Sequence, residues 1–309
     1  TWNALCDQPC EYASDCPDPN QDCAMPKKSG ALLQSYDEDP LIPKSCYPQR
    51  QMHHYNDMVI VTGASSEYFS GLENFVSSAK YWGSEFQVVV YNLGMTAEQL
   101  ATVRSWKHVY KLHWEDGIPE RYPPHVHDLH TYAWKPLIVN ETVHHYKSVF
   151  WMDAGATFTG PIHSIQTLLQ RHGIFLVKGQ DADMKTMSHP DTYSWFGKQS
   201  KDDFQDGLPH FAGGIQGHTY PSRYIDTIVV PNAKCALDPA CIAPPGSNLQ
   251  NHRYDQTSLS VLAYQQHVQP PGYTELLAAN RDQLAADLRQ PSQMLMWTSR
   301  NTCNYYTFL

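Results

Sequence analysis

The sequence of 309 residues has few charged side chains and no block of basic ones. Asp, Glu, Lys and Arg make up 17% of the chain, below the usual share of about one quarter. The formal net charge is −9 with histidine counted as neutral. Because nucleic-acid binding needs a basic patch on the protein, this composition argues against a general nucleic-acid binder.

The sequence also lacks a long apolar run and several signature motifs. No stretch of about eighteen or more apolar residues is present, so no segment is expected to span a membrane. Neither GxGxxG nor GxxxxGK[ST] occurs, which leaves a dinucleotide fingerprint and a P-loop without support. HExxH is absent too, so a secreted metal hydrolase that uses some of the 16 histidines is the weakest hypothesis.

Apolar strands that alternate with amphipathic helices predict an α/β fold with a mostly parallel central sheet flanked by helices. Hydrophobic residues make up 41% of the chain, enough for a substantial core. Strands are expected in 57–69, 85–94, 107–112, 148–158 and 173–180, and helices in 72–82, 96–106, 131–146, 164–173 and 254–267. We expect two parts, a Cys- and Pro-rich extension at residues 1–50 and the α/β domain at residues 51–309.

Eight cysteines point to an oxidising compartment. Four of them fall in the first two dozen residues, where disulfides are favoured over a zinc site because paired CxxC motifs are missing. Cys235 and Cys241 flank the segment ALDPA and are expected to close a small loop. Together with the sequon at Asn140, they predict a protein of the secretory pathway lumen, in the Golgi or ER, or a secreted one. Because the sequence starts at Thr1 without a signal peptide, we expect the trimmed ectodomain of a type II membrane protein.

In the stretch SVFWMDAGATF, residues 148–158, an apolar segment expected to be a buried strand is followed directly by a single acid, Asp153. A carboxylate at this place costs free energy unless a divalent cation, a substrate hydroxyl or a basic side chain pairs with it. Small residues follow at once, including Gly155, and leave room for a ligand. The alternative is an acid that merely caps a turn.

Four other segments are expected to meet Asp153, since ligands of open parallel sheets bind at the carboxyl ends of the strands. Gly63, Ala64 and Ser65 form a turn after the first strand, and Lys135 lies on the helix before the acidic strand. The segment HFAGGIQGH, residues 210–218, predicts an aromatic–Ala–Gly–Gly turn that leads into an apolar strand. Asp255 and Gln256 open a helix, where the helix dipole favours a carboxylate.

This order of motifs resembles the GT-A-fold glycosyltransferases, which transfer a sugar from a nucleotide donor, and most closely the glycogenin and galactinol-synthase type. The resemblance covers roughly residues 56–270 and rests on motif order. It implies that Asp153 is the first acid of an Asp-x-Asp motif and helps to hold a divalent metal on the donor diphosphate. It also implies a set of donor-binding residues: Gly63, Ala64, Ser65, Lys135, Asp153, Gly155, Ala212, Gly213, Gly214 and Gln256.

One residue departs from that pattern, because Gly155 stands where the second acid is expected. Mn²⁺ and Mg²⁺ prefer several oxygen ligands. The cation could therefore be held by Asp153 together with a histidine such as His252. It could also be absent, with Lys135 or Arg253 neutralising the phosphates, or the protein could be a catalytically inactive relative.

The catalytic residues expected from the resemblance are Asp153 and Asp255. Asp255 would be the base on the acceptor hydroxyl if the reaction inverts the sugar, whereas in a retaining enzyme Asp255 or Gln256 would orient the donor. The aromatic residues of DTYSWFG, residues 191–197, are equally expected to stack on a sugar or to form a local core.

The predicted function is a glycosyltransferase with a nucleotide-sugar donor and a glycan or glycoprotein acceptor, and with Mn²⁺ or Mg²⁺ as a possible cofactor. The alternative is a non-catalytic carbohydrate-binding or extracellular interaction protein on the same fold, which Gly155 favours.

Overall fold

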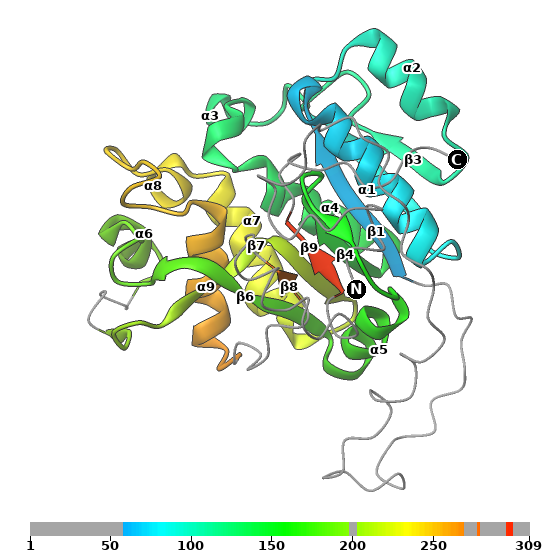
Figure 1. The fold of residues 1–309 in the computed structure, drawn as a ribbon. Helices are drawn as coiled ribbons and strands as arrows, with labels where there is room; N and C mark the ends of the chain where they lie inside the picture. The colour runs from blue at the N-terminus through cyan, green and yellow to red at the C-terminus, as the bar shows by residue number, and fades with distance from the viewer. Residues whose placement is uncertain (1–57, 198–202, 269–276, 279–294, 299–309) are drawn as a thin grey trace, which may run out of the picture.

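The computed structural model describes residues 58–197, 203–268, 277–278 and 295–298 (Figure 1). The predicted extension at residues 1–50, its boundary with the α/β domain and six of the eight cysteines lie outside the described residues.

The centre of the fold is a six-stranded sheet with the order β3-β2-β1-β4-β7-β6. Its strands are β1 Met58–Ala64, β2 Val88–Asn92, β3 Val109–His113, β4 Ser148–Met152, β6 Ile174–Asp183 and β7 Pro209–Thr219. The first four run parallel to one another, and β7 runs antiparallel to both β4 and β6. A small second sheet has the order β5-β9-β8, formed by Thr157–Phe158, Met296–Trp297 and Leu277–Ala278. The prediction of a mostly parallel sheet is thus confirmed.

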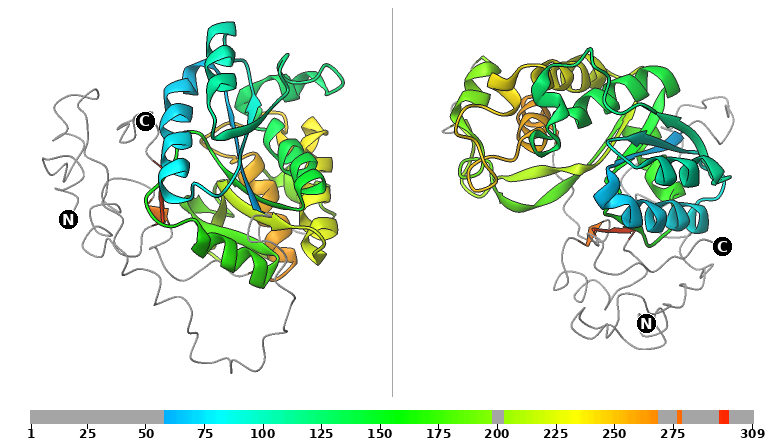
Figure 2. Two further views of the ribbon diagram at one scale, coloured as in Figure 1. Left: turned by 90° about the vertical axis from the view of Figure 1, so that its right-hand side faces the viewer. Right: turned by 90° about the horizontal axis from the view of Figure 1, so that it is seen from above.

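Helices cover both faces of the large sheet (Figures 1 and 2). The α-helices are α1 Phe69–Trp82, α2 Ala97–Ser105, α3 Pro124–His127, α4 Trp134–Tyr146, α5 His163–His172, α6 Pro190–Trp195, α7 Val230–Ala236, α8 Pro239–Ile242 and α9 Asp255–Gln265. Short 3₁₀ helices are η4 Ser66–Tyr68 and η5 Leu129–Thr131, and a π-helical turn, η7, spans Ile225–Val229.

Side chains alternate between the two faces of the sheet along each strand, so they contribute to two separate hydrophobic cores. In β1, Met58 and Ile60 pack with α1 and α5, whereas Val59 and Val61 pack on the other face with α4 and α7. All seven residues of β1 are buried, as expected for a parallel strand with helices on both sides. The two cores therefore fix β1 and β4, whose carboxyl ends lead into the β1–α1 and β4–α5 connections.

Of the local predictions from the sequence, one is confirmed and one is wrong. Thr96 and Gln99 form a capping box at the start of α2, and Pro136 falls in the first turn of α4. Cys235 and Cys241 are joined by a disulfide with a Cα–Cα distance of 5.2 Å. The predicted turn at the glycines of residues 210–218 is wrong, because β7 runs unbroken from Pro209 to Thr219.

Two further observations concern membrane-spanning helices and the sequon. Within the described ranges, no helix is both long and apolar enough to cross a membrane. The sequon at Asn140 lies inside α4, and its third residue, Thr142, is buried and donates a hydrogen bond to the carbonyl of Ile138.

Candidate active site

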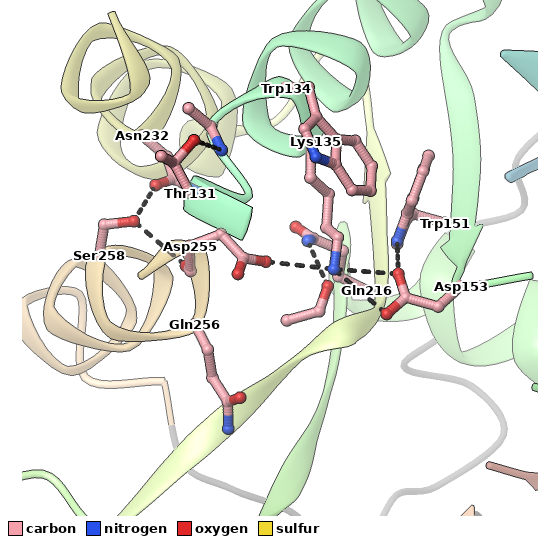
Figure 3. A network of polar contacts seen from close by, with 12 residues as sticks. Thr131, Trp134, Lys135, Trp151, Asp153, Gln216, Asn232, Asp255, Gln256 and Ser258 are labelled. Atoms are coloured by element: carbon pink, nitrogen blue, oxygen red, sulfur yellow. Dashed lines mark hydrogen bonds and ion pairs between the residues drawn. The ribbon is translucent and has the colours of Figure 1, made fainter. Parts of the chain in front are cut away.

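Three charged side chains from three different elements meet at the carboxyl edge of the sheet (Figure 3). Lys135 comes from the first turn of α4, Asp153 follows β4, and Asp255 is the first residue of α9. The Lys135 Nζ lies 3.0 Å from Asp153 Oδ1, 3.2 Å from Asp153 Oδ2 and 3.3 Å from Asp255 Oδ2. The ammonium group thus lies between two carboxylates, and the cluster carries a net charge of about −1.

Asp153 is fixed in place but keeps contact with solvent. Its backbone N–H donates to the carbonyl of Gly214 at 2.9 Å, which continues the β4–β7 pairing by one residue. Its Oδ1 also accepts a hydrogen bond from Trp151 Nε1 at 2.8 Å, and its side chain is 43% exposed. The acid therefore presents a firmly held carboxylate at the surface of the site.

Lys135 is the buried centre of the cluster. Its side chain is 4% exposed, and its Nζ lies 5.5 Å from the Trp134 ring, 5.6 Å from Tyr132 and 5.9 Å from Trp151. Burial alone would lower the pKa of Lys135, but the negative charges of Asp153 and Asp255 and the hydrogen bond to Asp153 more than offset this, and the pKa is raised. The lysine is therefore a permanent cation at neutral pH.

Asp255 is the buried acid of the cluster. Burial raises the pKa of its carboxyl group, and the positive charge of Lys135 opposes that effect. Its Oδ2 is shielded from solvent and accepts no geometrically sound hydrogen bond from the described residues, although Lys135 Nζ lies at ion-pair distance. A buried acceptor oxygen that is only partly satisfied is a suitable partner for a ligand hydroxyl.

Two glycines of β7 let the carboxylates approach the strand. A Cβ atom at Gly213 would lie 2.5 Å from Asp255 Oδ2, and one at Gly214 would lie 2.7 Å from Asp153 Oδ2. Any side chain at either position would displace a carboxylate of the cluster. The structure thus gives these predicted donor-lining residues a definite steric role, while Ala212 packs partly buried against the core.

The turn after β1 lies at the same edge of the sheet. Because Val61 pairs with Trp151 in the parallel β1–β4 ladder, Gly63 and Asp153 stand two residues further along adjacent strands. A Cβ atom at Gly63 would lie 3.1 Å from Leu93 Cδ1, so a side chain here would press on Leu93, while the Trp151 ring would lie at an ordinary contact distance of 3.4 Å. Gly63 and Ala64 are the last two residues of β1 and are buried, so the turn predicted at Gly63–Ser65 begins only at Ser65. Ser65 is the N-cap of η4, where its side chain makes no capping hydrogen bond.

Gln256 and Gly155 flank the cluster. The Gln256 side chain points away from Lys135 in Figure 3, and a Cβ atom at Gly179 of β6 would lie 2.7 Å from its Nε2. Gly155 lies in the turn after Asp153, in which the N–H of Ala156 donates to the Asp153 carbonyl at 2.9 Å.

His252 is engaged elsewhere. Its Nδ1 accepts a hydrogen bond from the His189 backbone at 3.1 Å, and its Nε2 donates to the carbonyl of Ile242 at 3.1 Å. Burial lowers the pKa of His252 to about 4, so the ring is neutral. Metal binding through His252 would therefore break one of two buried hydrogen bonds.

The fit of a divalent cation can be judged from the donor set. Within the described parts of the chain, no three His, Cys, Asp or Glu side chains are grouped to hold a metal ion. Asp153 nevertheless has spare acceptor capacity and solvent contact, and Mg²⁺ often binds through one carboxylate plus the phosphates of a substrate. The residues fit a cation that arrives with a diphosphate, with Asp153 as its protein ligand, and they do not fit a preassembled metal site.

Several parts of the site were not expected from the sequence. Trp151, Tyr132 and Tyr254 surround the cluster, and Gln216 donates a hydrogen bond to the Gly213 carbonyl at 3.1 Å from below it. The left-handed backbone of Tyr132 and Tyr254 has no sequence signal, because tyrosine rarely adopts it.

Tyr193 belongs to a local core and not to the site. It is 1% exposed and donates a hydrogen bond to the Met184 carbonyl at 2.5 Å. Trp195 donates to Asp238 Oδ2 at 2.8 Å, which ties α6 to the loop of the disulfide. Of the two interpretations of this aromatic segment, the structure supports a local core for Tyr193.

Comparison with known proteins adds a fold relationship. A family model described as "Protein of unknown function (DUF1647)" matches residues 42–140. A search of curated proteins finds no match. The apo structure of WbbM, a bifunctional glycosyltransferase, matches 80% of the chain with 10% sequence identity and a TM-score of 0.50. The two proteins share a fold. The match spans 46% of the WbbM chain.

Two other solved structures have lower TM-scores. Core-mannan synthase A from Aspergillus fumigatus, in a Mn/GDP form, matches 70% of this chain and 72% of its own at 10% identity, with a TM-score of 0.43. Mouse xyloside xylosyltransferase 1, in its apo form, matches 79% of this chain and 97% of its own at 10% identity, with a TM-score of 0.45. We therefore base the shared fold on WbbM. The closer resemblance to the glycogenin type stays a prediction.

Proposed function

We propose that the protein transfers a sugar from a nucleoside-diphosphate donor to a glycan or glycoprotein acceptor in the lumen of the secretory pathway. The observation that carries the proposal is the Lys135–Asp153–Asp255 cluster at the carboxyl edge of the sheet, where ligands of such folds bind. The fold shared with the WbbM glycosyltransferase supports it, and the Cys235–Cys241 disulfide supports the compartment.

In this proposal the diphosphate of the donor lies at the exposed side of the cluster, beside Asp153. One lysine and two carboxylates leave about one negative charge, so a diphosphate needs positive charge from another source. The backbone N–H of Ser65 can contribute, since Ser65 directly follows β1 at the same edge of the sheet as Asp153. A Mn²⁺ or Mg²⁺ ion carried by the donor would be held by Asp153 and would neutralise the charge of the leaving diphosphate.

Asp255 is the residue that acts on a sugar hydroxyl. Its partly satisfied Oδ2 points into the cluster, and burial raises its pKa, so it is a stronger base than a solvated aspartate. In an inverting reaction it would accept the proton of the acceptor hydroxyl as that oxygen bonds to the sugar carbon and the diphosphate leaves. In a retaining reaction it would orient the donor sugar through a hydrogen bond.

A panel of UDP- and GDP-sugars tests the proposal. Thermal shift and donor hydrolysis are measured with Mn²⁺, with Mg²⁺ and with EDTA. At least one donor is expected to stabilise the protein and to turn over. Turnover should fall roughly 100-fold or more in Asp153→Asn and Asp255→Asn, whereas Asp226→Asn on the surface serves as the matched control.

The alternative of a non-catalytic carbohydrate-binding protein has one observation in its favour, the glycine at position 155 in place of a second acid. Binding of free glycans without stabilisation by any nucleotide sugar would support that alternative and reject the transferase.

A further inference from the structure

Two tyrosines with an unusual backbone flank the charged cluster. Tyr132 has φ 54° and ψ 11°, and Tyr254 has φ 47° and ψ −119°. Positive φ is uncommon for residues other than glycine, and for a bulky side chain it is a true outlier that the surrounding structure must hold in place. Such strain often occurs at functional sites.

Each tyrosine is connected directly to one charged residue. The Tyr132 carbonyl accepts a hydrogen bond from the Lys135 N–H at 3.1 Å, in the turn that starts α4. Tyr254 immediately precedes Asp255, and its carbonyl accepts a hydrogen bond from the Ser258 N–H at 3.1 Å. The backbone angles of the two tyrosines therefore set the directions in which α4 and α9 begin, and with them the positions of Lys135 and Asp255.

The two tyrosine rings also contact each other. Their centroids are 5.8 Å apart with an interplanar angle of 49°. The Tyr254 ring is buried, lies 5.1 Å from the His252 ring, and its hydroxyl donates to the Ser247 carbonyl at 3.4 Å. The Tyr132 ring lies 5.6 Å from Lys135 Nζ. The ring pair thus links the start of α4 to the start of α9, the same two points that the Lys135–Asp255 ion pair links.

We propose that Tyr132 and Tyr254 are positioning residues, whose ring contact holds the starts of α4 and α9 at the spacing that places Lys135 Nζ against Asp255 Oδ2. They act through these two residues, and the inference about their effect on turnover rests on the proposed transferase function. If the strain only served to make tight turns, glycine would serve equally well at both positions. The ring contact predicts that it does not.

The test compares variants that separate backbone strain from the ring. Tyr132→Gly and Tyr254→Gly accept positive φ but remove the ring. Tyr132→Phe and Tyr254→Phe keep the ring. Lys147→Gly is the matched control, because Lys147 also has positive φ (68°) but lies at the far end of α4. Tyr132→Asn and Tyr254→Asn, which also tolerate positive φ, replace any glycine variant that fails to fold.

The first readout needs no substrate. The acylation rate of Lys135 by an N-hydroxysuccinimide acetate is measured by peptide mass spectrometry on the folded proteins. Lys135 should react slowly in the wild type, because it is buried and ion-paired. We expect roughly tenfold faster labelling in the glycine or asparagine variants and an unchanged rate in both Phe variants and in Lys147→Gly.

The second readout is the kinetics of a nucleotide-sugar donor accepted by the wild type. Loss of the ring should lower kcat roughly 10- to 100-fold, as expected for a misplaced catalytic group, with KM changed by less than about threefold and with rescue by phenylalanine. Unchanged Lys135 labelling in the glycine and asparagine variants would overturn the positioning inference, even if the wild type is an active transferase. Faster labelling in a protein that turns over no donor would support the positioning inference and reject the proposed function.

Discussion

Replacing Lys135 with methionine removes the ammonium group that lies between Asp153 and Asp255. Methionine has a similar length and keeps the apolar contacts of the lysine stem, so the variant isolates the loss of charge. The two carboxylates are left with different surroundings, because the Asp153 side chain is 43% exposed and that of Asp255 is 8% exposed. Water can solvate the first, whereas the second becomes a buried charge without a counterion.

The expected loss of stability follows from this difference. Removing one partner of a buried ion pair costs about 3–5 kcal/mol, because the remaining charge is uncompensated. The exposed pair with Asp153 adds at most about 1 kcal/mol. At about 2–4 °C per kcal/mol for a domain of this size, a total loss of about 3–6 kcal/mol should lower the melting temperature by roughly 6–24 °C at pH 8.

The loss should depend on pH in a defined direction. Without Lys135, the folded-state pKa of Asp255 rises further above its unfolded value of about 3.9. A group with a raised folded-state pKa binds more protons when folded, so its stabilising effect is present at low pH and is lost as pH rises through the folded-state pKa. Lys135→Met should therefore be closest to the wild type near pH 4.5 and furthest from it near pH 8.

Urea denaturation of both proteins from pH 4.5 to 8.5 measures this difference. Lys107→Met is the control, since Lys107 is an exposed lysine whose removal should change the unfolding free energy by less than about 0.5 kcal/mol. The second substitution Asp255→Leu should recover much of the loss, because the buried charge is then gone. A variant as stable as the wild type at pH 8, or a difference that does not change with pH, would refute the reasoning.

Two other predictions concern β7. In Gly214→Ala the new Cβ would lie 2.7 Å from Asp153 Oδ2, so donor turnover should fall at least about tenfold. The control is Gly217→Ala on the same strand, where the new Cβ would lie 3.2 Å from Phe175. This variant should lower the unfolding free energy by about 1–3 kcal/mol without a specific loss of kcat. Equal kinetic effects of the two would contradict the assigned role of Gly214. Burial lowers the pKa of His218 to about 3, so the unfolded chain binds the proton first as pH falls below about 6.5. This group should therefore lower the unfolding free energy by about 1.4 kcal/mol for each unit by which the pH falls. Urea denaturation between pH 7 and 4.5 should show that the unfolding free energy depends less steeply on pH in His218→Gln than in the wild type, whereas His130→Gln, at an exposed histidine, should match the wild type.

The sheet could be predicted from the sequence because its strands are buried on both faces. Val59, Ile60 and Val61 belong to an uninterrupted apolar run, which indicates a parallel strand whatever the tertiary context. The Gly213–Gly214 pair was misjudged, since two adjacent glycines are typical of a turn. In the folded protein they serve close packing within a strand, and that role depends on Asp153 and Asp255 from distant segments.

The candidate site was predicted in its acids and its lysine but not in their pairing. Asp153, Lys135 and Asp255 each follow from a local pattern, a strand end or a helix start. Their ion pairs depend on how α4 and α9 pack against the sheet, which no local pattern records. The same holds for Tyr132 and Tyr254, whose backbone angles oppose the local preference of tyrosine and are imposed by tertiary contacts.

The energetic cost of the cluster is itself an argument for its use. Burying Lys135 beside two carboxylates gives up the hydration of the ammonium group and of Asp255, and the ion pairs repay this only in part. An apolar group of similar size at each buried position would hold α4 and α9 together at least as well. Stability alone therefore does not account for three charges at the carboxyl edge of the sheet, two of them buried and one open to solvent. The function that we propose, in which Lys135 fixes both acids so that Asp153 meets a diphosphate-bound cation and Asp255 meets a hydroxyl, gives all three charges a use.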